Sequence, residues 1–241
     1  KKNTNPPAFI KGNIATAYSD WDRPAEAIPF SQKALEYALK MKNPQMEGVC
    51  YINLGAILCN IESLREEGIV MVKKAIPLLI EVNNKRRLCE AYVYLADAYR
   101  RGGNLNAAVE YLNLLEKLSS ELKTDVERYR YYRVKAPILQ DQQQYVEAIK
   151  YYLRITDMLE KGYRDVKDSE HYVRLAACYA AIHEDRKAYT CLQKAYALCD
   201  LNYQEKYVDR LSDFSVRYKT KEKELEIIRL RQKELEQEAV L

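Results

Sequence analysis

Apolar residues recur at steps of three and four along almost the whole chain, which is the period of an amphipathic α-helix. The clearest stretch is residues 86–122, where two such runs are separated by the sequence Gly-Gly-Asn at residues 102–104. Because glycine and asparagine favour tight turns, this stretch predicts two helices packed as a hairpin. The buried stripe of this hairpin is expected to contain Tyr92, Leu95, Tyr99, Ala108 and Leu112.

Four other segments match this hairpin at a spacing of about forty residues. A small residue early in each second helix marks the period, with successive steps of 41, 40, 40 and 40 residues: Ala27, Gly68, Ala108, Ala148 and Ala188. A single hairpin cannot bury both of its faces, so repeats in phase predict a stack with a continuous core. The predicted repeats cover about residues 8–42, 46–82, 87–122, 127–161 and 168–200.

Residues 203–241 have a different composition. From Lys219 onward they are rich in Glu, Lys and Arg and contain neither Gly nor Pro. We expect the first half to cap the fifth hairpin and to continue into a charged linker helix. Whether that helix stays single or pairs with a copy of itself as a coiled coil is left open by the pattern.

The spacing Tyr92-x-x-Leu95-Ala96-x-x-Tyr99 followed by Ala108-x-x-x-Leu112 resembles the tetratricopeptide repeat signature. Related patterns begin at Tyr51 and Tyr172, so the resemblance covers roughly residues 8–200. It implies an all-α fold, a right-handed α-solenoid of five helical hairpins with a long C-terminal helix. The period is about six residues longer than the 34 residues usual for that repeat.

The composition of the chain argues against some classes of function. The formal net charge is only +4, with both signs interspersed, which argues against nucleic-acid binding; an RNA-binding repeat protein would need a continuous basic stripe. No run of about twenty apolar residues is present, so no membrane segment is predicted within the chain. The chain opens with two lysines and no Met, and we interpret it as a piece of a longer protein.

Signs of catalysis are lacking in the sequence. It contains no zinc-protease, P-loop or serine-hydrolase motif, so no enzyme activity and no cofactor are expected. His183 occupies the turn position held by Gly103 in the third repeat. The six cysteines form no CxxC pair, and we predict no metal site and interpret five of them as small buried hydrophobes. These cysteines are Cys50, Cys59, Cys89, Cys178, Cys191 and Cys199.

Binding is therefore the expected activity. In tetratricopeptide proteins the first helices line a concave groove that holds an extended peptide or a partner's helix, and the resemblance places such a groove here. The residues it assigns to the groove are Asn13, Asn53, Asn60, Val93, Asp97, Arg100, Arg101, Arg130, Arg133 and Asp141. In peptide-binding relatives an Asn at the position of Asn13 and Asn53 hydrogen-bonds the peptide backbone.

Four arginines of this set, Arg100, Arg101, Arg130 and Arg133, are expected to converge in the middle of the groove. Guanidinium groups suit carboxylates, so the cluster predicts an acidic contact on the ligand. The alternative is that nearby Asp97 and Glu90 hold these arginines in local salt bridges.

The run from Ser212 to Lys223 resembles the end of the repeat region in bacterial membrane-anchored regulators. That resemblance implies the sensory region of a signal-transduction regulator, on the periplasmic side of the membrane, with possible self-association through the C-terminal helix. The alternative is a cytoplasmic scaffold that assembles two proteins. Six apparently unpaired cysteines favour the reducing compartment of this second reading.

Overall fold

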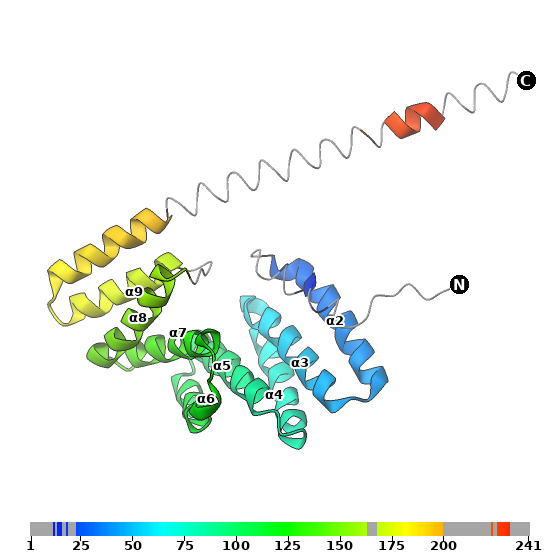
Figure 1. Ribbon diagram of the computed structural model, residues 1–241, viewed down its shortest axis with the longest axis horizontal. Coiled ribbons are helices and arrows are strands. Elements are labelled where there is room, and N and C mark those ends of the chain that lie inside the picture. Colours follow the sequence, from blue (N-terminus) through cyan, green and yellow to red (C-terminus); the bar gives the residue numbers. More distant parts are fainter. Residues whose placement is uncertain are drawn as a thin grey trace, which may run out of the picture.

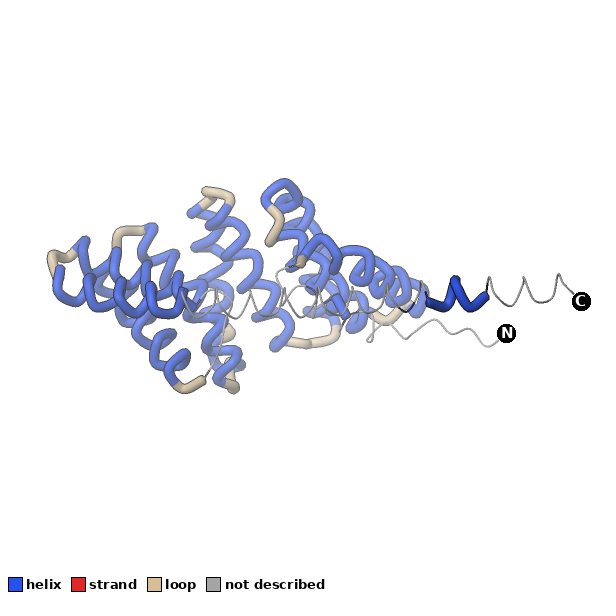
Figure 2. The backbone as a smooth tube through the Cα atoms, turned by 90° about the horizontal axis from the view of Figure 1, so that it is seen from above, coloured by secondary structure: helices blue, strands red, loops and turns tan. Residues whose placement is uncertain are grey.

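The computed structural model describes residues 23–162 and 168–199, together with residues 12, 14, 15, 18, 223 and 226–231. All regular elements of this described part are helical (Figure 2). The α-helices are α2 (Pro24–Met41), α3 (Pro44–Cys59), α4 (Arg65–Glu81), α5 (Lys85–Arg101), α6 (Leu105–Lys117), α7 (Asp125–Asp141), α8 (Tyr145–Glu160), α9 (Asp168–Ala181) and a last helix over residues 185–199. Two short 3-10 helices, η1 (Glu62–Leu64) and η2 (Ser119–Glu121), lie in connections.

Consecutive helices pair as antiparallel hairpins and stack in chain order along an arc (Figure 1). First helices of neighbouring hairpins touch each other, α3 against α5 and α5 against α7, whereas α4, α6 and α8 make no comparable contact with one another. Because the first helices are closer together than the second helices, the stack bends with α3, α5 and α7 on its inner side. Figure 1 shows α4 and α6 along the outer edge.

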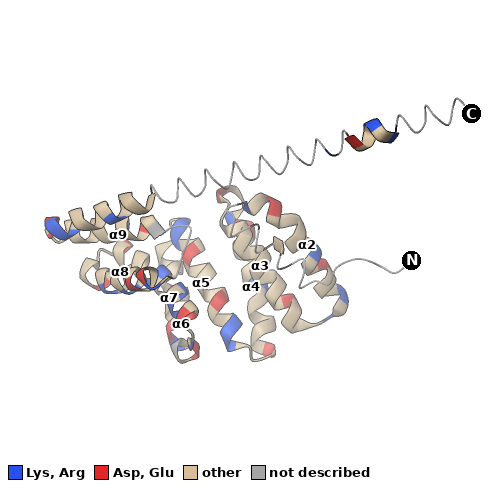
Figure 3. Ribbon diagram, turned by 45° about the horizontal axis from the view of Figure 1, so that its top comes forward, with Lys and Arg blue, Asp and Glu red and all other residues tan. Residues whose placement is uncertain are grey.

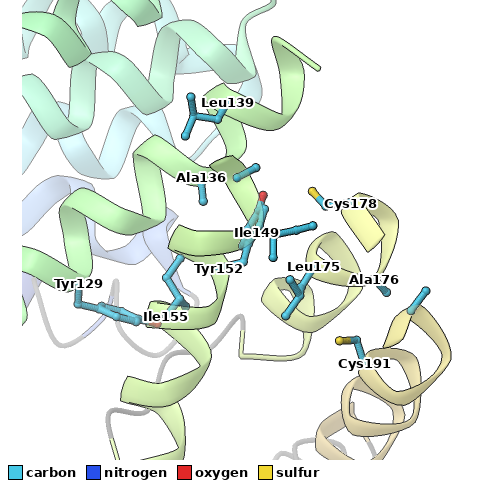
Figure 4. Close-up of a cluster of buried hydrophobic side chains, with 12 residues drawn as sticks. Tyr129, Ala136, Leu139, Ile149, Tyr152, Ile155, Leu175, Ala176, Cys178 and Cys191 are labelled. Carbon is cyan, nitrogen blue, oxygen red and sulfur yellow. The ribbon is translucent and has the colours of Figure 1, made fainter. Parts of the chain in front are cut away.

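Clusters of buried apolar residues follow one another along the stack, and most of them join side chains of neighbouring hairpins. The small crossing residues Ala27, Ala108, Ala148 and Ala188 are all buried, and so is Gly68. Figure 4 shows one cluster in which side chains of α7, α8, α9 and the last helix meet. The predicted all-α solenoid of helical hairpins is therefore confirmed.

Three of the hairpins close through the same turn. Gly103, Gln143 and His183 have φ angles of 81°, 62° and 61°, so each occupies the left-handed region at the same repeat position. Glycine adopts this conformation readily, whereas Gln and His do so with strain. The equivalence of His183 and Gly103 that the sequence suggests is thus a shared backbone geometry, and His183 is exposed.

Short polar side chains define where several of the helices begin. Asn43, Asn84 and Asn104 each accept a hydrogen bond from the backbone N–H three residues later, at 3.1–3.2 Å. Thr124 accepts from the N–H of Glu127, while the Glu127 carboxylate accepts from the N–H of Thr124 at 2.9 Å, forming a capping box. These caps satisfy N–H groups that have no partner inside the helix.

Most of the predicted cap and linker, residues 203–241, lies outside the described residues. Only residues 223 and 226–231 of it are described, and these are helical. The coiled-coil alternative therefore stays a prediction. No helix in the described part is both long and apolar enough to cross a bilayer.

Candidate binding surface

Charged residues of both signs occur along the inner helices α5 and α7 (Figure 3). The four arginines expected to converge there do not form one cluster, so that prediction is wrong. Arg100 reaches the end of α7, while Arg130 reaches Glu90 near the start of α5. Ten residues of helix separate these two contacts, which corresponds to about 15 Å.

The first group lies at the C-terminal ends of α5 and α7. Asp97 binds Arg100 at 3.3 Å and Arg101 at 3.5 Å, and Arg100 also binds Asp141 at 3.4 Å. Arg101 donates to the backbone carbonyl of Cys59, at the end of α3. These arginines are held by local partners, as the salt-bridge alternative predicted, and they join α5 to both neighbouring first helices.

The second group surrounds Glu90 near the start of α5. Arg87 on α5 and Arg130 on α7 each place an Nη1 atom 2.5 Å from one oxygen of the Glu90 carboxylate. Arg133, one turn further along α7, lies over the ring of Tyr129 at 5.7 Å. Here the arginines outnumber the carboxylate that they surround, unlike in the first group.

Val93 is not part of an open groove, which corrects the sequence-based prediction. Its side chain is only 8% exposed and belongs to a buried cluster with Val134 and Ile138 of α7. The reason is that neighbouring first helices pack against each other, and a short apolar side chain at this position is covered by the next helix. Val173, at the same position two repeats later on α9, is 46% exposed.

The asparagines predicted to bind a peptide backbone have separate positions. Asn13 lies outside the described residues. Asn53 is half-buried in the middle of α3, near residue 12 of the preceding hairpin. Asn60 is exposed at the very end of α3, where its N–H bonds the carbonyl of Ile57. The structure therefore does not bring Asn53 and Asn60 to one place.

Sequence reasoning missed several members of the inner surface, above all Arg87, Tyr94 and Arg174. Arg174 on α9 binds Glu170 at 2.8 Å. A usable signal was present, because residues of opposite charge recur one repeat apart: Glu90 with Arg130, and Arg100 with Asp141. Comparing charges one period apart would have found the ion pairs between α5 and α7.

A second polar cluster lies where α6, α7 and α8 meet. Lys135 donates to Glu116 at 2.6 Å and to the hydroxyl of Tyr131 at 2.9 Å, and it lies 4.7 Å from the ring of Tyr151. Burial raises the pKa of Tyr131 to about 12, so its hydroxyl stays protonated and donates to Glu116 at 3.0 Å. The cluster satisfies its own charges and joins three helices.

The thiols are built into the core. Five of the six cysteines are buried, and only Cys199 is exposed. Burial raises the pKa of Cys59, Cys89 and Cys178 to about 11, so these groups remain neutral thiols at physiological pH. Within the described residues, no group of three or more His, Cys, Asp or Glu side chains is placed to hold a metal ion.

These features define the class of protein. The stacked hairpins, with small residues where their helices cross and first helices on the inner side, form a tetratricopeptide-like α-solenoid. No known family profile matches the chain, and no curated protein sequence does either.

Solved structures share this fold at low sequence identity. BtubC from P. vanneervenii matches with a TM-score of 0.61 at 15% identity, over 79% of each chain. NprR, solved in complex with its cognate peptide NprX, matches with a TM-score of 0.61 at 14% identity, over 84% of this chain and 60% of that one.

A further match is a signal transduction ATPase with a tetratricopeptide repeat sensor, PH0952 from Pyrococcus horikoshii. Its TM-score is 0.60 at 20% identity, over 80% of this chain and 29% of that one. The chain thus spans less than two thirds of the length of both NprR and the ATPase.

Proposed function

We propose that this chain is a binding module that holds a protein or peptide segment along the inner surface formed by α3, α5, α7 and α9. The observation that carries the proposal is the exposed charge on α5 and α7 beside a well-packed core, since Arg87 and Arg130 are about 40% exposed although both are ion-paired. The complex of NprR with its peptide supports the proposal, because it has the same fold.

Selection from a random peptide library tests this proposal. Bound peptides are expected to slow hydrogen exchange in α3, α5 and α7, and an Arg130→Glu variant is expected to weaken their binding. Lys150→Glu is the matched control, because Lys150 lies on the outer helix α8 and pairs with exposed Glu147. If no peptide is enriched, or if protection is confined to α4, α6 and α8, the inner surface is not the binding site.

We further propose that the module is the sensory region of a bacterial regulator, whose C-terminal helix passes on the state of the inner surface. The tetratricopeptide sensor of the signal transduction ATPase supports this role. A bound peptide is then expected to change hydrogen exchange in residues 226–231. Unchanged exchange there, with the peptide bound at the inner surface, would contradict this part alone.

The proposed location is the periplasmic side of a membrane-anchored protein. A cytoplasmic scaffold is the second candidate, and the five buried cysteines favour it, because free thiols persist in a reducing compartment. A reporter enzyme that is active only outside the cytoplasm, fused to this module in the full-length protein, separates the two. Activity of the reporter supports the sensor, and an inactive but intact fusion supports the scaffold.

A further inference from the structure

The region around Glu90 combines one carboxylate with several cations. Glu90 is the middle of a three-residue bridge, because its two oxygens bind Arg87 and Arg130 separately, and its side chain is only 13% exposed. Arg133 follows Arg130 by one helical turn on α7. Two guanidinium groups therefore share a single, mostly covered carboxylate.

The charges just beyond this group do not cancel the excess. Glu127 is the next carboxylate of α7, and it is paired with Arg86 at 2.5 Å. With this neutral pair included, three arginines, Arg86, Arg87 and Arg130, are paired with two carboxylates, which leaves a net charge of +1 among these residues. In the first group, by contrast, Asp97 and Asp141 balance Arg100 and Arg101.

Donors on this patch remain available for a ligand. A guanidinium has five N–H groups, and the ion pair with Glu90 uses one Nη1 of each arginine. The side chains of Arg87 and Arg130 are 39% and 43% exposed. Tyr94 is half-buried one helical turn after Glu90 on α5, and its hydroxyl makes no hydrogen bond to the residues that the structure describes. Burial raises the pKa of Tyr94, so this hydroxyl is a donor at neutral pH.

We propose that Arg87, Arg130 and the Tyr94 hydroxyl form a subsite for the carboxylate of an acidic residue in a peptide ligand. One acidic side chain would balance the net charge of +1, so the preferred ligand carries an Asp or Glu residue at this subsite. This inference rests on the proposed peptide-binding function and names the class of peptide. Glu90 has a definite role in it, because it competes with the ligand carboxylate for the same arginines.

The probe is a fluorescein-labelled peptide of alternating glutamate and serine, compared with the same peptide carrying glutamine in place of glutamate. Fluorescence anisotropy is expected to show binding of the glutamate peptide at least tenfold tighter, and weaker binding as salt is raised. Equal affinity for the two peptides would overturn the proposal. Tighter binding of a peptide with phosphoserine and no carboxylate would overturn it too, by identifying a phosphate site.

Two substitutions with opposite expected signs locate the subsite. Arg130→Gln should weaken binding of the glutamate peptide about tenfold, and Glu90→Gln should tighten it several-fold by releasing Arg87 and Arg130. Lys150→Gln on α8 is the control and should change nothing, and melting curves establish that each variant folds. Weakening by both substitutions would indicate a merely structural role for the pair and contradict the proposal.

Failure of this inference and failure of the proposed function remain distinguishable. If library peptides protect α3, α5 and α7 but are indifferent to Arg130→Gln and Glu90→Gln, the function stands and the acidic preference is wrong. If neither library peptides nor the glutamate peptide bind, the proposed function fails.

Discussion

The two helices of the α3–α4 hairpin cross more closely than those of the neighbouring α5–α6 hairpin. Alanines face each other in α5–α6, at Ala96 and Ala108, and both are fully buried. In α3–α4 the equivalent residues are Gly55 and Gly68. A Cβ on Gly55 would lie 2.8 Å from the carbonyl oxygen of Gly68, and one on Gly68 would lie 2.7 Å from that of Gly55. In α3–α4 the backbones themselves are therefore in contact.

The connections of the two hairpins differ as well. Thirteen residue steps lead from Gly55 to Gly68, and twelve lead from Ala96 to Ala108. The extra residue removes the left-handed turn position, and the chain passes instead through the 3-10 helix η1. Arg101 of α5 then donates to the Cys59 carbonyl, where α3 ends. A repeat can thus change both its turn and its crossing distance while the stack continues.

The largest expected effect comes from placing an alanine in the glycine crossing. Gly68→Ala would put a Cβ 2.6 Å from the Cys59 backbone nitrogen, so α3 and α4 must move apart. Alanine favours helix by about 1 kcal/mol over glycine, yet we expect a net loss of about 2–3 kcal/mol in the free energy of unfolding. Urea unfolding measures it.

The reverse change in the next hairpin is the control. Ala108→Gly is expected to cost only about 1–2 kcal/mol, from lower helix propensity and a small void. If Gly68→Ala turns out to stabilise the protein, α3 and α4 have room to separate, and the contrast between the two hairpins is not one of backbone contact.

Arg101→Met tests how much the contact with α5 stabilises the longer connection between α3 and α4. Methionine keeps most of the apolar stem but cannot donate to the Cys59 carbonyl or bind Asp97. We expect a loss of about 1–2 kcal/mol, because a hydrogen bond to a charged group is removed at a partly buried site. Lys150→Met removes the ion pair of Lys150 with Glu147 between two exposed residues and should change stability by less than about 0.5 kcal/mol. Equal effects of the two substitutions would show that Arg101 does not support the turn.

Glu127→Gln distinguishes the ionised start of α7 from the uncharged cap of α5. The backbone N–H of Thr124, together with Arg86, lowers the pKa of Glu127 to about 2. Because the unfolded pKa is about 4.3, the stabilisation is fully present above that pH and disappears as pH falls through about 2. Glutamine keeps the capping geometry, so a loss of about 1 kcal/mol at pH 7 should vanish near pH 2.

Stability of wild type and variant measured by urea unfolding from pH 2 to pH 7 checks this. Asn84, which caps α5, carries no ionisable group, so Asn84→Ser serves as a pH-independent reference. A constant difference between wild type and Glu127→Gln across the range would contradict the assignment.

The smallest expected effect concerns the turns of the regular hairpins. Gln143→Gly and His183→Gly should each raise stability by about 0.5–1 kcal/mol, because glycine relieves the left-handed backbone at these positions. Thermal unfolding measures the gain. Gly103→Ala should lower stability by a similar amount, and a stabilising Gly103→Ala would show that the three turns are not equivalent.

The periodic part of the fold follows directly from the sequence. Crossing residues such as Ala108 and Ala148 recur at a constant step, and both are fully buried. The exposed side chains of the inner surface were harder to predict from the sequence. Val93 and Arg133 share one repeat position, yet the first is core and the second is a half-buried cation. Which side chain is covered depends on the next helix, and a single-helix pattern does not contain that information.

The ion-pair partners of the arginines were the other feature that the sequence could not fully predict. The sequence indicated Asp97 and Glu90 as local partners of the arginines. Whether Arg130 lies beside Glu90 or beside Arg100 and Asp97 depends on how α7 is shifted along α5. That shift follows from packing between neighbouring helices. The repeat period carries a trace of it, because each partner lies 40 or 41 residues away.

The ion pairs between α5 and α7 also have a mechanical consequence. Arg86 with Glu127, Glu90 with Arg130, and Arg100 with Asp141 connect the two helices near their start, further along and at their end. Bending the stack between α5 and α7 lengthens several of these ion pairs together, so the ion pairs stiffen the contact between the two helices. Because dissolved ions screen these ion pairs, the spring constant of the contact between α5 and α7 depends on ionic strength.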